Sequence, residues 1–253
     1  MMRISTYLRA IAGQAAEPRA AKPGSTRAPV VIWNTLRRCN LTCKHCYSTS
    51  ADIDFKGELD TAEALDVIDQ LHEAGVRVLV LSGGEPLMRP DIFQLAQHAR
   101  NYGFYVALST NGTLITERNI EQIADCDFDY VGISIDGLPG IHDEFRRMAG
   151  GFAAAMNGVR LCREKNLRVG LRTTLTQYNF PQLPALLDLM REYDVQKYYL
   201  SHLNYSGRGK RNQSVDAHRS MTRQAMTTIF NRAWEDVQNG KETDFPAQLL
   251  TVF

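Results

Sequence analysis

Cysteine is scarce in this sequence, which has five cysteines among 253 residues. The number is odd, and three of the five fall within the eight positions 39–46. Cysteines this close together cannot join distant loops by disulfide bonds. The pattern therefore excludes a disulfide framework of the kind found in small secreted domains and favours a reducing compartment.

An excess of charge is also missing, because 29 basic residues face 28 acidic ones and the net charge is +1. This balance excludes the basic footprint of a nucleic-acid-binding protein. No apolar run approaches the roughly 18 residues that a membrane span needs, and the opening MMRISTYLRAIAGQ lacks the apolar core and cleavage site of a signal peptide. We expect a cytoplasmic protein that binds neither nucleic acid nor membrane.

Apolar runs typical of buried parallel strands alternate along the chain with segments of helical periodicity. In the first predicted helix, Asp60 and Glu63 have the spacing of a capping box, and Gly75 follows the last apolar position. We count six such units, with strands at 30–36, 76–83, 105–111, 130–136, 168–176 and 197–205 and helices at 59–75, 90–103, 118–126, 152–166, 180–194 and 218–240.

The six units predict the fold class and the domain organisation. Alternating strands and helices with right-handed crossovers give an α/β fold, a partial (β/α)6 barrel of the TIM type with parallel strands and outer helices. A chain of 253 residues is commonly a single domain of this kind. We expect an N-terminal arm at 1–29, whose Ala- and Pro-rich part looks flexible, a barrel core at 30–240 and a short tail at 241–253.

Polar residues recur within or at the carboxyl ends of the predicted strands, the face on which such barrels carry their active sites. A single case is weak evidence, because a glycine pair after a strand is more often a plain turn. The agreement across all six units indicates a site built from Cys39, Gly83, Gly84, Glu85, Ser109, Asn111, Ser134, Asp136, Arg172, His202 and Tyr205.

The three clustered cysteines, Cys39, Cys43 and Cys46, have the spacing C-x3-C-x2-C. A structural zinc site needs four ligands, and His45 cannot easily be the fourth because it lies between two of the cysteines. The two remaining cysteines lie on distant predicted helices and are expected to be small buried hydrophobes. The triplet fits three corners of a [4Fe–4S] cluster, whose fourth iron stays open to an exchangeable ligand.

The sequence resembles the radical S-adenosylmethionine (SAM) enzymes in this triplet and in the "GGEP" turn at 83–86. The resemblance implies that Cys39, Cys43 and Cys46 hold the cluster and that its open iron binds SAM. It also implies a set of SAM contacts. The backbone of Gly83 and Gly84 and the side chain of Glu85 meet the methionine amine, Ser134 and Arg172 the carboxylate, Ser109 and Asn111 the ribose, and His45 and the backbone near Leu203 the adenine.

In such enzymes the reduced cluster and SAM generate a 5′-deoxyadenosyl radical that abstracts hydrogen from the substrate. The protein positions the reacting groups and excludes water. We therefore assign no catalytic acid–base residue. The pair His142–Asp143, which might suggest one, is expected to cap a helix start in solvent.

A narrower resemblance, spread over nearly residues 2–240, is to the NirJ family, the radical SAM proteins of heme d1 biosynthesis. It implies action on propionate side chains of a siroheme-derived tetrapyrrole, with a flavodoxin or ferredoxin as a suitable electron donor. The basic segment with Arg208, Lys210 and Arg211 is a candidate receiver of substrate carboxylates, as are Arg146 and Arg147. For the segment with Arg208, Lys210 and Arg211, a solvated loop is a nearly equal alternative interpretation.

Members of that family continue into a C-terminal extension with further cysteines, whereas no cysteine follows Cys162 here. An auxiliary cluster is therefore not expected from this chain, and its activity by itself is an open question. Two other functions remain. One is a radical SAM peptide maturase, and the other is a non-enzymatic iron–sulfur or zinc protein.

Overall fold

The computed structural model describes residues 2–13, 29–240 and 246–247. Its centre is one twisted sheet with the strand order β1-β8-β7-β6-β5-β4-β3-β2. The six strands from β2 to β7 are parallel to their neighbours. They are β2 (Val30–Asn34), β3 (Val78–Ser82), β4 (Tyr105–Thr110), β5 (Tyr130–Ser134), β6 (Val169–Thr174) and β7 (Lys197–Ser201).

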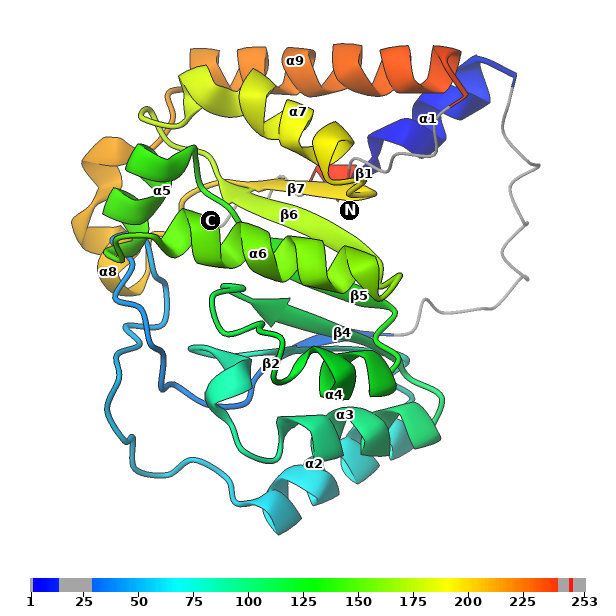
Figure 1. The fold of residues 1–253 in the computed structure, drawn as a ribbon, viewed down its shortest axis with the longest axis vertical. Helices are drawn as coiled ribbons and strands as arrows, with labels where there is room; N and C mark the ends of the chain where they lie inside the picture. The colour runs from blue at the N-terminus through cyan, green and yellow to red at the C-terminus, as the bar shows by residue number, and fades with distance from the viewer. Residues whose placement is uncertain (1, 14–28, 241–245, 248–253) are drawn as a thin grey trace.

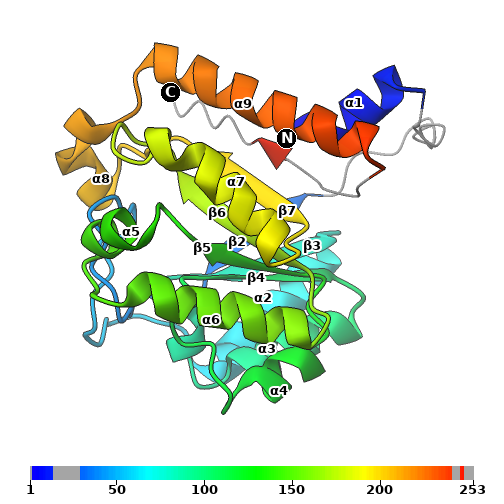
Figure 2. The ribbon, with the colours of Figure 1, turned by 45° about the horizontal axis from the view of Figure 1, so that its top comes forward.

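Helices follow the strands and cover the outer face of the sheet, with α7 and α9 over one part and α2, α3, α4 and α6 over the rest (Figures 1 and 2). The α-helices that the structure describes are α1 (Ile4–Ile11), α2 (Thr61–Glu73), α3 (Ile92–Asn101), α4 (Ile120–Asp125), α5 (Pro139–Arg146), α6 (Gly151–Glu164), α7 (Leu183–Glu192), α8 (Gly207–Arg211) and α9 (Arg219–Gln238). The described residues also form three 3-10 turns, at Pro86–Met88, Phe180–Gln182 and Gln213–Val215.

The predicted fold class is confirmed, since six strand–helix units form a parallel, open-sided sheet. The capping box is present at the start of α2, where Glu63 N donates to the Asp60 side chain and Asp60 N donates to that of Glu63. The predicted buried cysteines, Cys126 and Cys162, are 1% and 0% exposed. Sheet and helices share one continuous apolar core, which holds the strand ends in place.

The chain ends differ from the expected arm and tail. Residues 4–11 form α1, which packs along α9, and β1 (Met2–Arg3) pairs antiparallel with β8 (Pro246–Ala247). The strand β8 also joins β7, so the sheet extends beyond the predicted six strands. Residues 14–28, which include nearly all of the Ala- and Pro-rich part of the predicted arm, and most of the predicted tail lie outside the described residues.

Two short helices, α5 and α8, were not predicted as elements. They lie beside each other at the end of the sheet from which the loops after β5 and β7 emerge (Figure 1). Among the residues that the structure describes, no helix is both long and apolar enough to cross a membrane.

Candidate active site

A cavity of about 400 Å³ opens at the carboxyl ends of the parallel strands. This is the face that carries the active site in barrels of this type. The structure brings most of the predicted site residues together in its lining, namely Cys39, Cys43, His45, Cys46, Gly83, Gly84, Ser109, Asn111, Ser134, Arg146, Arg172, His202 and Arg208.

The three cysteines lie in the segment 37–51 that follows β2, which we call the cysteine loop. Its two ends are joined by a hydrogen bond from Cys39 N to Ala51 O of 3.0 Å, and its middle is held by Lys44 N, which donates to Phe145 O at 2.8 Å. The loop is therefore fixed at both ends and at its tip, the last by α5.

The environments of the three thiols differ. Cys39 and Cys43 are buried, and burial raises the pKa of Cys39 to about 12 and also raises the pKa of Cys43. Cys46 is half-buried. Burial acts to raise the pKa of Cys46 as well, but hydrogen bonds from Ser50 and Ser48 outweigh it and lower the pKa. Deprotonation of the first two thiols therefore needs a partner that binds thiolate.

The donor set fits a [4Fe–4S] cluster better than a single metal ion. Within the described ranges, no three Cys, His, Asp or Glu side chains lie close enough together to hold one ion. Three thiols around one cavity suit a cubane, because each thiolate binds a different iron. Arg146 and Arg208 interact electrostatically with Cys43 and offset the negative charge that such a group brings.

The glycine turn after β3 packs against the backbone of the cysteine loop. Gly83 has a φ of +155°, and a Cβ there would lie 2.7 Å from Leu36 O. A Cβ on Gly84 would lie 2.2 Å from Arg38 O. The turn is also hydrogen-bonded to this segment through Gly84 N to Leu36 O at 2.7 Å and Glu85 N to Arg38 O at 2.9 Å. Both glycines are thus needed for contact between two protein segments, besides lining the cavity.

The side chain of Glu85 is fully buried and does not line the cavity. It accepts hydrogen bonds from Thr110 Oγ1 at 2.7 Å, from Asn111 N at 2.7 Å and from Leu87 N at 3.2 Å. Burial raises the pKa of Glu85, and these hydrogen bonds oppose that rise. These hydrogen bonds tie the turn after β3 to the end of β4, and the expected contact of this side chain with the methionine amine stays a prediction.

The predicted contacts from β4, β5 and β6 lie side by side. The guanidinium of Arg172 donates to Ser109 Oγ and stands over the ring of Tyr199, with 5.7 Å from Cζ to the ring centroid. Ser134 is the register partner of Arg172 and donates to Thr110 O at 3.2 Å. An arginine and two hydroxyl groups at one wall of the cavity form a suitable receptor for a carboxylate.

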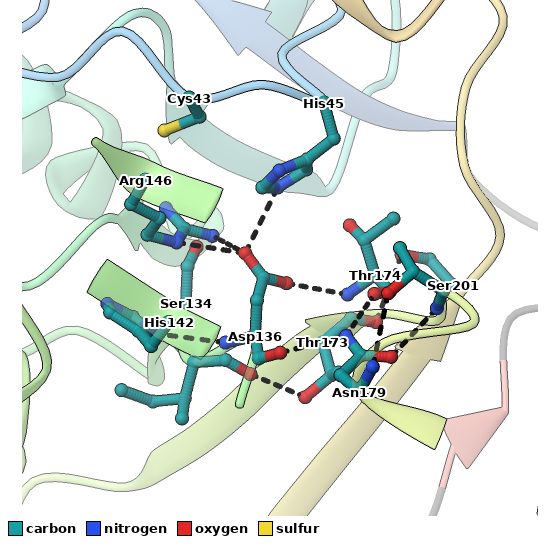
Figure 3. A network of polar contacts seen from close by, with 12 residues as sticks. Cys43, His45, Ser134, Asp136, His142, Arg146, Thr173, Thr174, Asn179 and Ser201 are labelled. Carbon is teal, nitrogen blue, oxygen red and sulfur yellow. Dashed lines mark hydrogen bonds and ion pairs between the residues drawn. The ribbon is translucent and has the colours of Figure 1, made fainter. Parts of the chain in front are cut away.

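A buried polar network lies beneath the cysteine loop (Figure 3). Asp136 is 1% exposed, and its Oδ2 lies 3.0 Å from His45 Nε2 and 2.7 Å from Arg146 Nη2. Its Oδ1 accepts from Thr174 N at 2.9 Å. Burial acts to raise the pKa of Asp136, but Arg146 and His45 hold it well below its ordinary value. The network fixes the ring of His45 at the cavity wall.

The expectation for the pair His142–Asp143 is half right. Asp143 does cap, since it accepts from Gly150 N and Phe152 N at the start of α6. His142 is 0% exposed rather than solvated. Its Nδ1 accepts from Asp136 N at 3.2 Å. Burial, and then Arg146, lower the pKa of His142 to about 4, so the ring is neutral near pH 7.

The remaining predicted residues follow β7. Leu203 is a buried residue, 6% exposed, between two residues that line the cavity. Arg208 lies at the cavity, but its side chain donates to carbonyl groups of the cysteine loop. Lys210 and Arg211 are exposed on α8. The segment is therefore a short helix against the cysteine loop and not an open basic loop.

Sequence reasoning missed the role of Asp136 and of Arg146 as a buried ion pair. The sequence pattern marks Asp136 only as a polar residue after a strand and Arg146 as a candidate contact of substrate carboxylates. A charged residue directly after a continuous apolar run, followed ten positions later by an arginine, was the available signal. In the structure Arg146 lines the cavity, and its Nε and Nη2 are bound to Asp136.

An open parallel barrel with three cysteines and a glycine turn around one cavity defines an enzyme class that binds an iron–sulfur cluster and a small cofactor. The model of the radical SAM superfamily matches residues 33–201, and the chain belongs to this family. Members use a [4Fe–4S] cluster together with SAM.

Among curated relatives, the chain is 47% identical over 238 residues to the pre-heme d1 synthase of Dinoroseobacter shibae, covering 94% of this chain and 58% of the relative. It is 41% identical over 226 residues to the Fe-coproporphyrin III synthase of Methanosarcina barkeri, covering 89% and 56%. The mycofactocin maturase MftC of Mycobacterium tuberculosis is 33% identical over 184 residues, covering 72% and 46%. The chain thus spans little more than half the length of the first two relatives.

Solved structures share the fold. Streptococcus suis SuiB bound to S-adenosylmethionine has a TM-score of 0.73 and 16% identity, over 86% of this chain and 49% of that one. anSMEcpe with bound AdoMet has a TM-score of 0.71 and 21% identity, over 86% and 63%.

Proposed function

We propose that this protein is a radical SAM enzyme of heme d1 biosynthesis that acts on propionate side chains of a siroheme-derived tetrapyrrole. The observation that carries the proposal is the 47% identity to a pre-heme d1 synthase over 94% of this chain. Further support comes from relatives named Fe-coproporphyrin III synthase and AdoMet-dependent heme synthase.

When bound, the cluster and SAM supply a 5′-deoxyadenosyl radical for hydrogen abstraction. We propose that Cys39, Cys43 and Cys46 hold the cluster at the cavity wall. Arg172 and Ser134 are proposed to take the SAM carboxylate, because Arg172 presents an always charged, planar donor beside a hydroxyl group. The Glu85 side chain stays a proposed contact of the methionine amine, because its Oε2 accepts a single hydrogen bond, from Asn111 N.

The other SAM contacts are proposed from their places in the lining. Ser109 and Asn111 would meet the ribose, and the backbone of Gly83 and Gly84 the methionine amine. The ring of His45, held by Asp136, would flank the adenine. The buried side chain of Leu203 leaves only the neighbouring backbone for that role.

For the substrate carboxylates we propose Lys210 and Arg211, the exposed cations of α8. Arg208 is not included, because its Nε and Nη1 are bound to carbonyl groups of the cysteine loop and its Nη2 is buried. A flavodoxin or ferredoxin is the proposed electron donor. The five unpaired cysteines and an oxygen-sensitive cluster support a cytoplasmic location.

The test is an anaerobic reaction of the reconstituted chain with SAM, a reductant and a siroheme-type tetrapyrrole. We expect SAM cleavage, formation of 5′-deoxyadenosine and a tetrapyrrole product whose mass shows loss of propionate groups. The variant with Lys210→Gln and Arg211→Gln should bind this substrate about tenfold less tightly and keep its cluster, because charge-assisted hydrogen bonds contribute about 1.5–3 kcal/mol each. SAM cleavage with no binding of any tetrapyrrole would contradict the proposal.

A radical SAM peptide maturase is the second candidate. The 33% identity to mycofactocin maturase MftC over 72% of this chain favours it. Modification of a peptide, with no change in the visible spectrum of a tetrapyrrole on mixing, would establish this alternative.

A further inference from the structure

The segment 204–212 after β7, which we call the latch, lies against the cysteine loop although the two are more than 150 residues apart in the chain. Five of its polar groups donate to main-chain carbonyl groups of the loop, one of them being Gly209 N, which donates to Cys46 O at 3.4 Å. Ser206 Oγ donates to Tyr47 O at 3.0 Å and Arg208 N to Cys46 O at 2.8 Å. Asn212 Nδ2 donates to Lys44 O at 2.8 Å, and the Arg208 guanidinium provides the fifth.

The two segments touch so closely that glycine is required between them. Gly207 has a φ of +55°, and a Cβ on it would lie 2.4 Å from Tyr47 O. A Cβ on Gly209 would lie 2.2 Å from Asn204 O and 3.2 Å from His45 O. The latch therefore has no room for side chains in place of these glycines, and it fixes the course of the cysteine loop.

The guanidinium of Arg208 is bound on one side only. Its Nε donates to Cys43 O at 2.7 Å and its Nη1 donates to Ser50 O at 2.8 Å. Its Nη2 is buried and has no hydrogen-bond partner among the described residues. Arg208 also lines the cavity and interacts electrostatically with the thiols of Cys43 and Cys46. A buried, unpaired N–H group of a cation costs free energy unless an acceptor is bound there.

We propose that Arg208 is a positioning residue of the iron–sulfur centre. It holds the cysteine loop through two carbonyl groups, and its unused Nη2 N–H groups would donate to sulfur when the cluster is bound by the cysteines. A positive charge and hydrogen bonds at the sulfur atoms favour the reduced cluster, so Arg208 raises the reduction potential of the centre. The inference rests on the cluster and SAM chemistry of the family and not on the identity of the substrate.

The experiment compares wild type, Arg208→Gln, Arg208→Lys and the exposed control Arg211→Gln, each reconstituted anaerobically without substrate. Midpoint potentials are measured by redox titration followed by electron paramagnetic resonance, and iron and sulfide are counted per chain. We expect Arg208→Gln to shift the reduction equilibrium at least tenfold toward the oxidised cluster, which is about 59 mV for one electron. Arg211→Gln, which removes the same charge from the same helix, should shift it less than twofold.

Arg208→Lys separates the two parts of the proposal. It keeps the charge but loses the two donor groups that bind the loop carbonyls. The reduction equilibrium of the cluster should therefore stay within about threefold of wild type, while amide hydrogen exchange of residues 43–51 becomes faster. If Arg208→Gln does not assemble a cluster, the proposal is tested by the reduction potential of Arg208→Lys and by the amide hydrogen exchange of its residues 43–51. Equal potentials in wild type and Arg208→Gln, or unchanged loop exchange in Arg208→Lys, would overturn the proposal. Tetrapyrrole turnover plays no part in these readouts, so failure of the proposed function is detected separately.

Discussion

Arg146 and Asp136 form an ion pair, with 2.7 Å between Nη2 and Oδ2, in which the two side chains are only 9% and 1% exposed. The pair lies between the cysteine loop and the end of β5 (Figure 3). Its carboxylate also binds His45, so one buried charge pair links a cavity-lining ring to the sheet. The consequences for stability and assembly are testable.

The first prediction is that Arg146→Gln destabilises the fold strongly. Removal of one partner leaves the buried carboxylate of Asp136 without its main countercharge, which typically costs about 3–5 kcal/mol. Urea unfolding of the chain without cluster measures the change in the free energy of unfolding. The neighbouring exposed cation gives the control, since Arg147→Gln should change this free energy by no more than about 0.5 kcal/mol. Similar changes in the free energy of unfolding for the two variants would show that the ion pair does not stabilise the fold.

The second prediction concerns pH and His142. The pKa of this ring is lowered from 6.5 to about 4 in the folded chain. The unfolded chain therefore binds more protons as the pH falls, and the fold loses stability from about pH 6.5 down to about pH 4, below which the loss is complete. The loss amounts to about 3 kcal/mol at most.

The measurement is the free energy of unfolding of the cluster-free chain at several pH values. His142→Gln should remove this component of the pH dependence, and the exposed control His218→Gln should retain it. An equal fall in stability between pH 6.5 and pH 4 for wild type and His142→Gln would contradict the assignment.

The third prediction concerns Gly84. Since its Cβ would lie 2.2 Å from Arg38 O, Gly84→Ala must displace the start of the cysteine loop. We expect reduced iron content after reconstitution and a lower free energy of unfolding, and not merely weaker binding of SAM. Gly140→Ala is the matched control, because a Cβ there meets nothing within 4 Å. Full iron content with only a loss of SAM affinity in Gly84→Ala would favour a purely cofactor-facing role.

The sequence predicts the fold well because its signals are local. Apolar runs mark each strand from β2 to β7, and the capping box at Asp60 marks the start of α2. The cysteine triplet and the glycine turn are likewise short motifs whose spacing carries their chemistry. Each of these features is complete within one stretch of about ten residues.

The parts that the sequence did not reveal depend on contacts between distant segments. Arg208 reaches Cys43 O across 165 positions, whereas the sequence shows only a basic segment that could receive substrate carboxylates or be solvated. The direction of the Glu85 side chain is set by donors on β4, and a motif alone does not show it. The short helix α8 has five residues, too few to show a helical period.

The most direct test of the account is whether the cysteine triplet holds a cluster that cleaves SAM. Iron, sulfide and 5′-deoxyadenosine are measured for the anaerobically reconstituted wild type, Cys43→Ala and Cys162→Ala. We predict about four iron and four sulfide per chain with SAM cleavage for wild type and Cys162→Ala, and loss of both in Cys43→Ala. A full cluster with turnover in Cys43→Ala, or one zinc per chain without SAM binding in wild type, would contradict it.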